Sequence, residues 1–145
     1  MNDVGSTLIA HCGARKVTRE YLKTIPIPEG TKTHQPTLVV ELEHFGFKGY
    51  GEAPAIAYYN IPVEKMIADL EAKKQFVEKF AFTEPERYWH YLHHLFPQNS
   101  FLVCALDIAA WDIYGKMKGK KLYELWGGDI SRNPTSDYTI GIDRI

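Results

Sequence analysis

The fold of this chain is decided by the stretch Phe101-Leu-Val-Cys-Ala-Leu-Asp-Ile-Ala-Ala-Trp-Asp-Ile-Tyr-Gly-Lys-Met-Lys-Gly119. The stretch predicts a helix that is apolar on nearly every side and is interrupted by Asp107 and Asp112. A helix of this kind has to be covered all round. One sheet covers one face only, so we expect a sheet of this chain on one side and a second domain on another.

The composition is that of a soluble globular protein, since 45% of the 145 residues are apolar and 24% are charged. A net charge of -1 provides no field for nucleic acid or an anionic membrane, and we exclude both as partners. Residues 1–14 lack a signal-peptide pattern, and no apolar run approaches membrane-spanning length. Cys12 and Cys104 provide no disulfide framework, with Cys104 expected inside the buried helix. These features predict a cytoplasmic protein.

The residues before this helix carry strand and turn signals. Residues 15–24 alternate in polarity and predict a strand. Residues 25–36 contain three prolines and a glycine, which predicts a loop of about a dozen residues. Residues 37–44 alternate again, and the chain returns as residues 47–51, so this part is expected to be a β-hairpin.

Two further helices are expected between the hairpin and the central helix. One begins near Pro62, and the second begins at Thr83-Glu-Pro-Glu86, which has the residue types of a capping box. This order predicts an α+β fold, with an antiparallel β-meander followed by a helical bundle. Residues 138–142 then predict a new strand that has no partner of its own.

Three motifs resemble the enolase superfamily: Gly49-Tyr-Gly-Glu-Ala-Pro54, Ala105-Leu-Asp-Ile-Ala-Ala-Trp-Asp-Ile-Tyr-Gly-Lys116, and Thr135-Ser-Asp-Tyr-Thr-Ile-Gly-Ile-Asp143. Over residues 37–143 the chain is similar to the dipeptide epimerases of the muconate-lactonizing branch. This resemblance implies an N-terminal capping domain in residues 1–134. Residues 135–145 would begin a (β/α)8 barrel, whose remaining part, about 200 residues, is absent.

The chemistry implied by the resemblance is removal and return of the proton α to a carboxylate. A lysine takes the proton while Mg²⁺ stabilises the enediolate. The expected full-length enzyme is an epimerase acting on a dipeptide or an N-acyl amino acid. Muconate cycloisomerase, N-acylamino acid racemase and o-succinylbenzoate synthase remain alternatives. The family carries its lysines and metal ligands on later barrel strands, so we assign no catalytic or metal residue here and expect this stretch alone to be inactive.

In such an enzyme the cap contributes to substrate selection, because in the family two loops of the cap close over the mouth of the barrel. They correspond here to residues 25–35 and 55–60. Lys32 is the only lysine or arginine in the first loop, where related epimerases often have arginine. It is a candidate to bind a carboxylate at the far end of a dipeptide, and the alternative is a solvated loop cation. Tyr58, Tyr59 and Thr139 are the other candidate substrate-binding residues. The expected partners are the substrate, the barrel domain of the same protein and a second copy in a full-length homo-oligomer.

Other polar groups have simpler interpretations. His90 and His94 have the spacing of zinc ligands, but no third ligand is in register, so a solvated helix face is favoured. Asp107 and Asp112 point in different directions on a helix, which favours helix-surface or interdomain hydrogen bonds over catalysis. Glu52 is interpreted as a structural hydrogen-bonding group.

A function of another class also remains open. The chain would then be a stand-alone, non-catalytic binding or oligomerisation module. Continuation of the reading frame into a lysine-bearing second barrel strand would discriminate the two possibilities.

Overall fold

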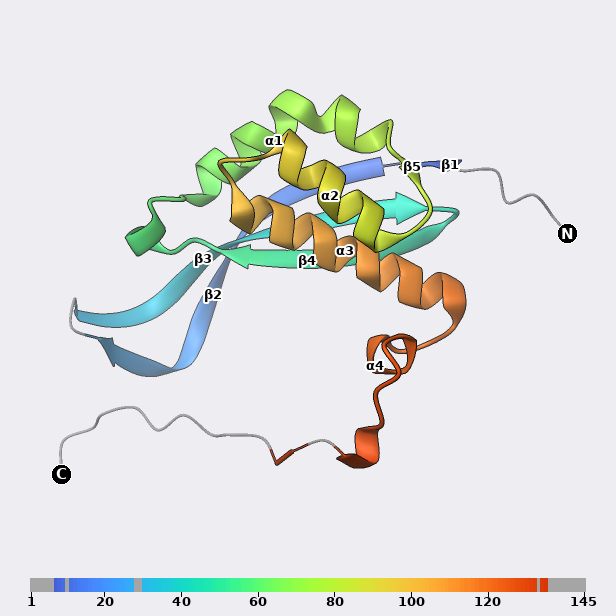
Figure 1. The fold of residues 1–145 in the computed structure, drawn as a ribbon. Coiled ribbons are helices and arrows are strands. Elements are labelled where there is room, and N and C mark those ends of the chain that lie inside the picture. The colour runs from blue at the N-terminus through green and yellow to red at the C-terminus, as the bar shows by residue number, and fades with distance from the viewer. Residues whose placement is uncertain (1–6, 10, 28–29, 133, 136–145) are drawn as a thin grey trace, which may run out of the picture.

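The computed structural model describes residues 7–9, 11–27, 30–132 and 134–135. Three long strands are followed by three long helices (Figure 1). The strands are β2 (His11–Ile27), β3 (Gly30–His44) and β4 (Phe47–Pro54); the helices are α1 (Val63–Glu78), α2 (Pro85–Leu95) and α3 (Ser100–Lys118). The short elements are β1 (Thr7–Leu8), η1 (Ala57–Tyr59), β5 (Ala81–Phe82), α4 (Leu122–Leu125) and η2 (Ile130–Arg132). This arrangement confirms the α+β fold class, while the strand expected at residues 138–142 lies outside the described residues.

The three long strands form one antiparallel sheet in the order β2-β3-β4. Leu38 lies opposite Lys16 on β2 and opposite Ala53 on β4. The turn between β3 and β4 places Phe45 and Gly46 at positive φ values of 50° and 77°, and glycine accepts this conformation without steric cost. The short strands β1 and β5 form a separate two-stranded sheet.

Residues 25–27 and 30–36 are not part of the loop that the prolines predicted, because they belong to β2 and β3. Ile25 pairs with Lys32, and a register shift separates Glu20 from Ile25. Proline is tolerated here for a positional reason. Pro26 lies on the edge strand β2, and Pro36 lies on β3 beyond the last residue of β4, which pairs with Thr37. A missing N–H donor therefore costs little at either position.

The helices cover one face of the sheet, as Figure 1 shows, and the core lies between these two layers. Leu38, Val40 and Leu42 alternate along β3 toward the helices and are fully buried. The helices contribute Met66, Leu70, Leu102, Leu106 and Ile113, all without exposed surface. Periods of two in the strand and about 3.6 in the helices bring these side chains to one interface.

Helix α3 approaches β4 so closely that only glycine fits on the strand. A Cβ added to Gly51 would lie 1.8 Å from the carbonyl oxygen of Ala105, and one added to Gly49 would lie 2.1 Å from that of Ala109. Ala105 and Ala109 are buried, as small residues at a close helix–strand contact should be. The sequence motif Gly-Tyr-Gly thus has a packing cause.

Two local expectations were wrong. Cys104 belongs to α3 but is exposed, because it lies on the side of the helix opposite the buried Leu106 and Ile113. The capping box expected at Thr83 does not form, since Glu84 is the N-cap of α2 and its side chain makes no capping hydrogen bond. Within the described residues, no helix is long and apolar enough to cross a membrane.

Candidate functional site

A groove of about 440 Å³ lies at the end of the sheet where β3 has passed the last residue of β4. Its polar lining residues are His34, Gln35 and Asn60; its apolar ones are Pro36, Ala55, Ala57, Ile61 and Pro62. The groove therefore combines an apolar surface with a few polar groups, which is the usual character of a small-molecule site.

Gln35 holds one wall of this groove in place. Its side-chain amide donates to the carbonyl oxygen of Ala55 at 2.6 Å and to that of Pro36 at 2.9 Å. The backbone N–H of Ala55 also donates to the Pro36 carbonyl at 2.9 Å. These hydrogen bonds join β3 to Ala55, the first residue after β4. They fix the start of the second loop.

The second loop is itself short and closed. Ile56 and Ile61 form an antiparallel bridge at its base, and Asn60 adopts a left-handed conformation with φ 51° while its N–H donates to the carbonyl of Ala57 at 2.9 Å. Asparagine tolerates this conformation better than most residues. The loop thereby presents Tyr58 and Tyr59 outward, and their side chains are 88% and 57% exposed.

The two tyrosines form an aromatic row with the first turn of α3. The rings of Tyr58 and Tyr59 meet at 90° with centroids 5.1 Å apart, and Tyr59 lies 5.4 Å from Phe101. The contact between the two tyrosines is edge-to-face, an arrangement that aromatic pairs prefer. Both predicted residues thus lie beside the groove on an ordered, solvent-facing loop.

The other two candidate residues are less fully described. Lys32 belongs to β3, opposite Ile25 and two residues before His34 of the groove; its side chain lies outside the described part of the structure. Thr139 lies outside the described residues altogether. Sequence reasoning missed Gln35 and Asn60; their signals were a polar side chain next to Pro36 and a residue prone to positive φ after two tyrosines.

The acidic residues of α3 differ in their surroundings. Oδ2 of Asp112 accepts from the backbone N–H of Tyr50 at 3.0 Å and from Nζ of Lys116 at 2.8 Å. This carboxylate therefore satisfies an edge amide of β4, in a structural role. Asp107 is half-buried, its Oδ1 makes no hydrogen bond with a described residue, and burial together with Glu86 raises its pKa to about 6.

The described residues contain no group of three or more His, Cys, Asp or Glu side chains that could hold a metal ion. His90 and His94 are exposed on α2, and Nδ1 of His94 lies 2.8 Å from the carbonyl oxygen of His90. This geometry fits the solvated helix face that the sequence favoured. A second concavity, of about 470 Å³, lies on the other face of the sheet and is lined by His11, Arg15, Val39, Glu41 and Tyr50 among others.

The sequence of this chain matches a known protein family. Residues 14–127 match the model for the N-terminal domain of mandelate racemase / muconate lactonizing enzyme. The L-Ala-D/L-amino acid epimerase of Flavobacterium johnsoniae is 44% identical over 133 residues, covering 89% of this chain and 40% of that protein. The L-Ala-D/L-Glu epimerase of Bacteroides thetaiotaomicron is 35% identical over 114 residues, which are 78% of this chain and 29% of that protein.

A solved structure shows the same fold. The dipeptide epimerase from Cytophaga hutchinsonii, in complex with Mg and the dipeptide D-Ala-L-Val, superposes with a TM-score of 0.78 at 20% identity, covering 94% of this chain and 38% of that one. This chain spans about 40% or less of the length of the curated relatives it matches. It belongs to the mandelate racemase/muconate lactonizing enzyme N-terminal domain family of the enolase superfamily.

Proposed function

We propose that this chain is the capping part of a magnesium-dependent epimerase. The enzyme would invert the configuration at the α-carbon of one residue of a dipeptide. The observation that carries the proposal is the 44% identity to an L-Ala-D/L-amino acid epimerase over 89% of the chain. The Cytophaga hutchinsonii neighbour holds magnesium and a dipeptide, which supports both the metal and the substrate class. In this proposal residues 1–134 form the cap and residues 135–145 begin the barrel.

The described residues do not fit a magnesium site, because they include no group of three acidic or other ligand side chains. We therefore assign metal binding and proton transfer to the part of the enzyme beyond this chain. The cap contributes binding and orientation. Remote contacts with a substrate accelerate the reaction when they hold the reacting carbon in the productive geometry.

The groove supplies such a contact. Its apolar residues, including Ala57 and Ile61, suit an aliphatic or aromatic side chain of the dipeptide, and Tyr58 and Tyr59 stand next to it. Lys32, two residues before the groove lining, adds a positive charge that would favour a substrate with a distal carboxylate. In the proposed enzyme the barrel mouth lies against this end of the cap, and a homo-oligomer of the complete protein is part of the same proposal.

The test uses the complete enzyme that contains this chain. Purified enzyme with Mg²⁺ is incubated in D₂O with L-Ala dipeptides that differ in the second residue, and exchange at each α-carbon is followed by NMR. We expect deuterium to enter one α-position together with inversion. Absence of both events for every dipeptide, with exchange of a different carboxylate substrate instead, would reject the dipeptide assignment.

The second candidate function, a stand-alone binding or oligomerisation module, is favoured by one observation: α3 exposes Cys104 and the apolar Ile108, which is 44% exposed. A module of this kind would be stable and monodisperse by itself as a defined oligomer. The cap of an enzyme would instead gain stability when joined to its barrel. Sedimentation of the purified 145-residue chain over a range of concentrations distinguishes the two.

A further inference from the structure

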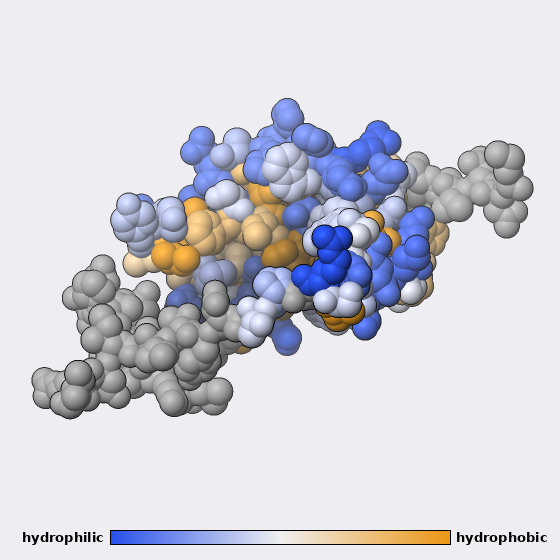
Figure 2. Space-filling model, turned by 60° about the horizontal axis from the view of Figure 1, so that its bottom comes forward, coloured by the Kyte–Doolittle hydropathy of each residue, from blue (hydrophilic) through white to orange (hydrophobic). Residues whose placement is uncertain are grey.

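A concavity of about 470 Å³ lies on the face of the sheet that the helices leave open. Its lining includes His11, Gly13, Arg15, Val39, Glu41 and Tyr50. We call this concavity the outer hollow. Figure 2 shows hydrophobic residues gathered across the middle of one face of the molecule, between hydrophilic rims. The outer hollow is a feature of another kind, because its larger lining side chains are charged or polar.

Gly13 provides the room for the outer hollow. It lies opposite Glu41 on β3, which in turn lies opposite Tyr50 on β4, so these three residues form one row across the sheet. The row points away from the helices, because it alternates with the buried side chains of the neighbouring positions. A Cβ placed on Gly13 would lie 2.9 Å from Nε2 of His11. A larger residue at this position would therefore fill the space next to the His11 ring.

Glu41, the acid in this lining, already has its partners. Nζ of Lys48 donates a hydrogen bond to Oε1 of Glu41 at 2.8 Å. This hydrogen bond, and after it one from Tyr50, lowers the pKa of Glu41. The carboxylate of Glu41 is thus ionised and balanced by Lys48, so it has little attraction left for a cationic ligand.

Arg15 is in the opposite situation. Its side chain is exposed, and no hydrogen bond or ion pair joins its guanidinium to a residue that the structure describes. His11 lies on the other side of Gly13 along β2, on the same face of the strand, and its exposed ring makes no hydrogen bond with a described residue either. A guanidinium only donates, and an imidazole has an N–H in either protonation state. The unused groups of the outer hollow are therefore donors, which suit an anion.

We propose that the outer hollow binds a small organic acid, whose carboxylate contacts the guanidinium of Arg15 and whose apolar part packs against Val39 and the ring of Tyr50. The planar guanidinium can donate two parallel hydrogen bonds to one carboxylate. Tyr50 is 45% exposed, so its ring is accessible to a ligand. His11 adds a further donor across Gly13.

The volume of the outer hollow favours an organic acid over an inorganic anion. About 470 Å³ falls within the range of roughly 300 to 1,000 Å³ that is usual for small-molecule sites. Inorganic phosphate would use the same donors but would leave Val39 and Tyr50 uncovered. The outer hollow shares no lining residue with the groove beside Tyr58 and Tyr59, and this inference does not rest on the proposed function.

The first experiment titrates the 145-residue chain with benzoate and follows its backbone amides by NMR. We expect saturable shifts at Gly13, Val39 and Tyr50, and much smaller ones at Ala57 and Ile61 of the groove. Benzamide has nearly the same shape without the charge and should cause no saturable shift. Equal binding of benzamide, binding of phosphate at least as tight as that of benzoate, or shifts confined to the groove would each overturn the proposal.

The second experiment changes the site. Arg15→Gln should weaken benzoate binding about tenfold or more, because it removes a charge-assisted hydrogen bond. The matched control is Arg87→Gln, an exposed arginine of α2 outside the outer hollow, which should change the Kd by less than about twofold. Gly13→Ala should also weaken binding, since its methyl group takes up room beside His11.

The amide spectrum of each variant without ligand shows whether the chain is folded. Benzoate binding that survives both Arg15→Gln and Gly13→Ala would overturn the proposal. So would an equal loss in Arg15→Gln and Arg87→Gln, since the attraction would then come from the overall charge. No dipeptide and no metal enters these measurements, so their outcome is independent of whether the complete enzyme is an epimerase.

Discussion

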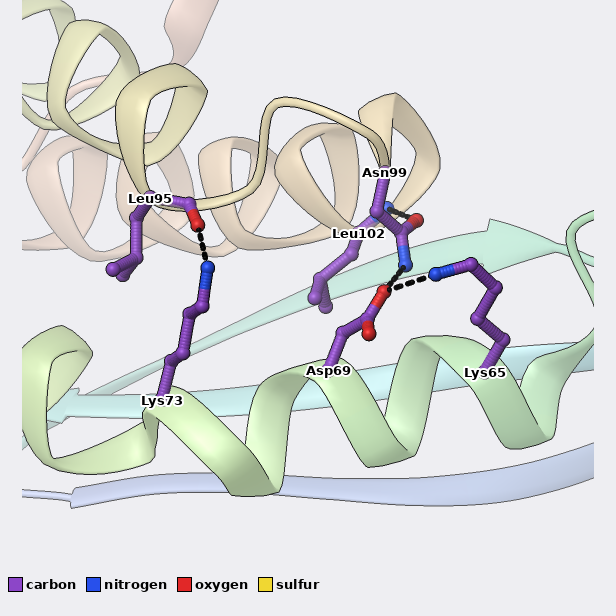
Figure 3. A network of polar contacts seen from close by, with 6 residues as sticks. All are labelled: Lys65, Asp69, Lys73, Leu95, Asn99 and Leu102. Atoms are coloured by element: carbon purple, nitrogen blue, oxygen red, sulfur yellow. Dashed lines mark hydrogen bonds and ion pairs between the residues drawn. The ribbon is translucent and has the colours of Figure 1, made fainter.

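The side-chain amide of Asn99 donates a hydrogen bond to Oδ2 of Asp69 at 2.8 Å and thereby joins the beginning of α3 to the middle of α1 (Figure 3). The same side chain accepts from the backbone N–H of Leu102 at 3.1 Å, so Asn99 is also the N-cap of α3. Lys65 donates to the same Asp69 oxygen at 2.8 Å. A single buried residue thus starts the central helix and fixes its position.

Asn99→Ala removes both the cap and the link to Asp69. We expect a loss of about 2 kcal/mol in the free energy of unfolding, measured with urea, because each lost interaction contributes about 1 kcal/mol. Lys65→Ala is the control, since it removes an exposed ion pair of the same network and should cost less than about 0.5 kcal/mol. Equal losses for the two variants would show that the cap does not position α3.

Gly51→Ala should be strongly destabilising. The added Cβ would lie 1.8 Å from the carbonyl oxygen of Ala105, and backbone of α3 cannot yield as a side chain can. We expect a loss of about 3 kcal/mol or more in unfolding free energy. Gly13→Ala provides the comparison, because its new Cβ would meet only the end of the His11 side chain, at 2.9 Å. A similar small effect in both variants would contradict the close approach of α3 to β4.

The sequence predicted the parts of the fold that depend on regular periodicity. The alternation over residues 37–44 predicted the strand that contains Leu38, Val40 and Leu42, and the apolar stretch 101–119 predicted a helix that needs cover on several sides. The pairing of residues 25–27 with residues 30–32 was missed because proline is a local signal. Whether Pro26 and Pro36 break a ladder depends on which strand lies beside them, and that is a property of the tertiary structure.

Only one part of the candidate site, the loop of Tyr58 and Tyr59, could be predicted from the sequence, because the other part depends on the tertiary structure. The loop of Tyr58 and Tyr59 followed from the resemblance, whereas the groove arises where β4 ends before β3 does. Strand ends of this kind are set by packing and by Gln35, not by a motif. The exposure of Cys104 also escaped the sequence, since apolar periodicity shows that a face needs cover but does not say whether this chain supplies it.

The Asp107 carboxylate should make the stability of the 145-residue chain depend on pH. Its folded-state pKa is raised to about 6 from an ordinary value of 3.8, by burial and by Glu86; Tyr88 and Cys104 are its other titratable neighbours. The folded state therefore binds the proton more tightly, and stability rises as pH falls through 6 toward 4. Urea midpoints at several pH values, compared with Asp107→Asn, measure this difference. If the difference in urea midpoint between the unaltered chain and Asp107→Asn stays constant from pH 7 to 4, the raised pKa of Asp107 is refuted.

Lys32→Ala tests charge selectivity in the complete enzyme. If Lys32 binds a distal carboxylate, kcat/KM should fall about 10- to 100-fold for dipeptides that end in glutamate and should change little for neutral ones. Epimerisation is followed at saturating Mg²⁺, and Lys79→Ala, an exposed lysine at the end of α1, is the control. Equal losses for acidic and neutral dipeptides would remove Lys32 from substrate recognition.

The groove predicts a selectivity for side-chain size, which Ala57→Phe tests in the same enzyme. Ala57 lines the groove from η1 and is itself exposed, so a larger side chain can be added there without disturbing the core. The phenyl ring would occupy space that we assign to the second side chain of the dipeptide. We expect kcat/KM to fall at least tenfold for L-Ala dipeptides with a large second residue and to change less than twofold for Ala-Ala, because a pocket that loses room discriminates by the groups it excludes. Ala72→Phe, on the exposed side of α1 and outside the groove, is the matched control and should alter neither value. An equal fall in kcat/KM for the large dipeptides and for Ala-Ala would indicate a general disturbance of the cap. Unchanged kcat/KM for both would place the substrate away from this groove.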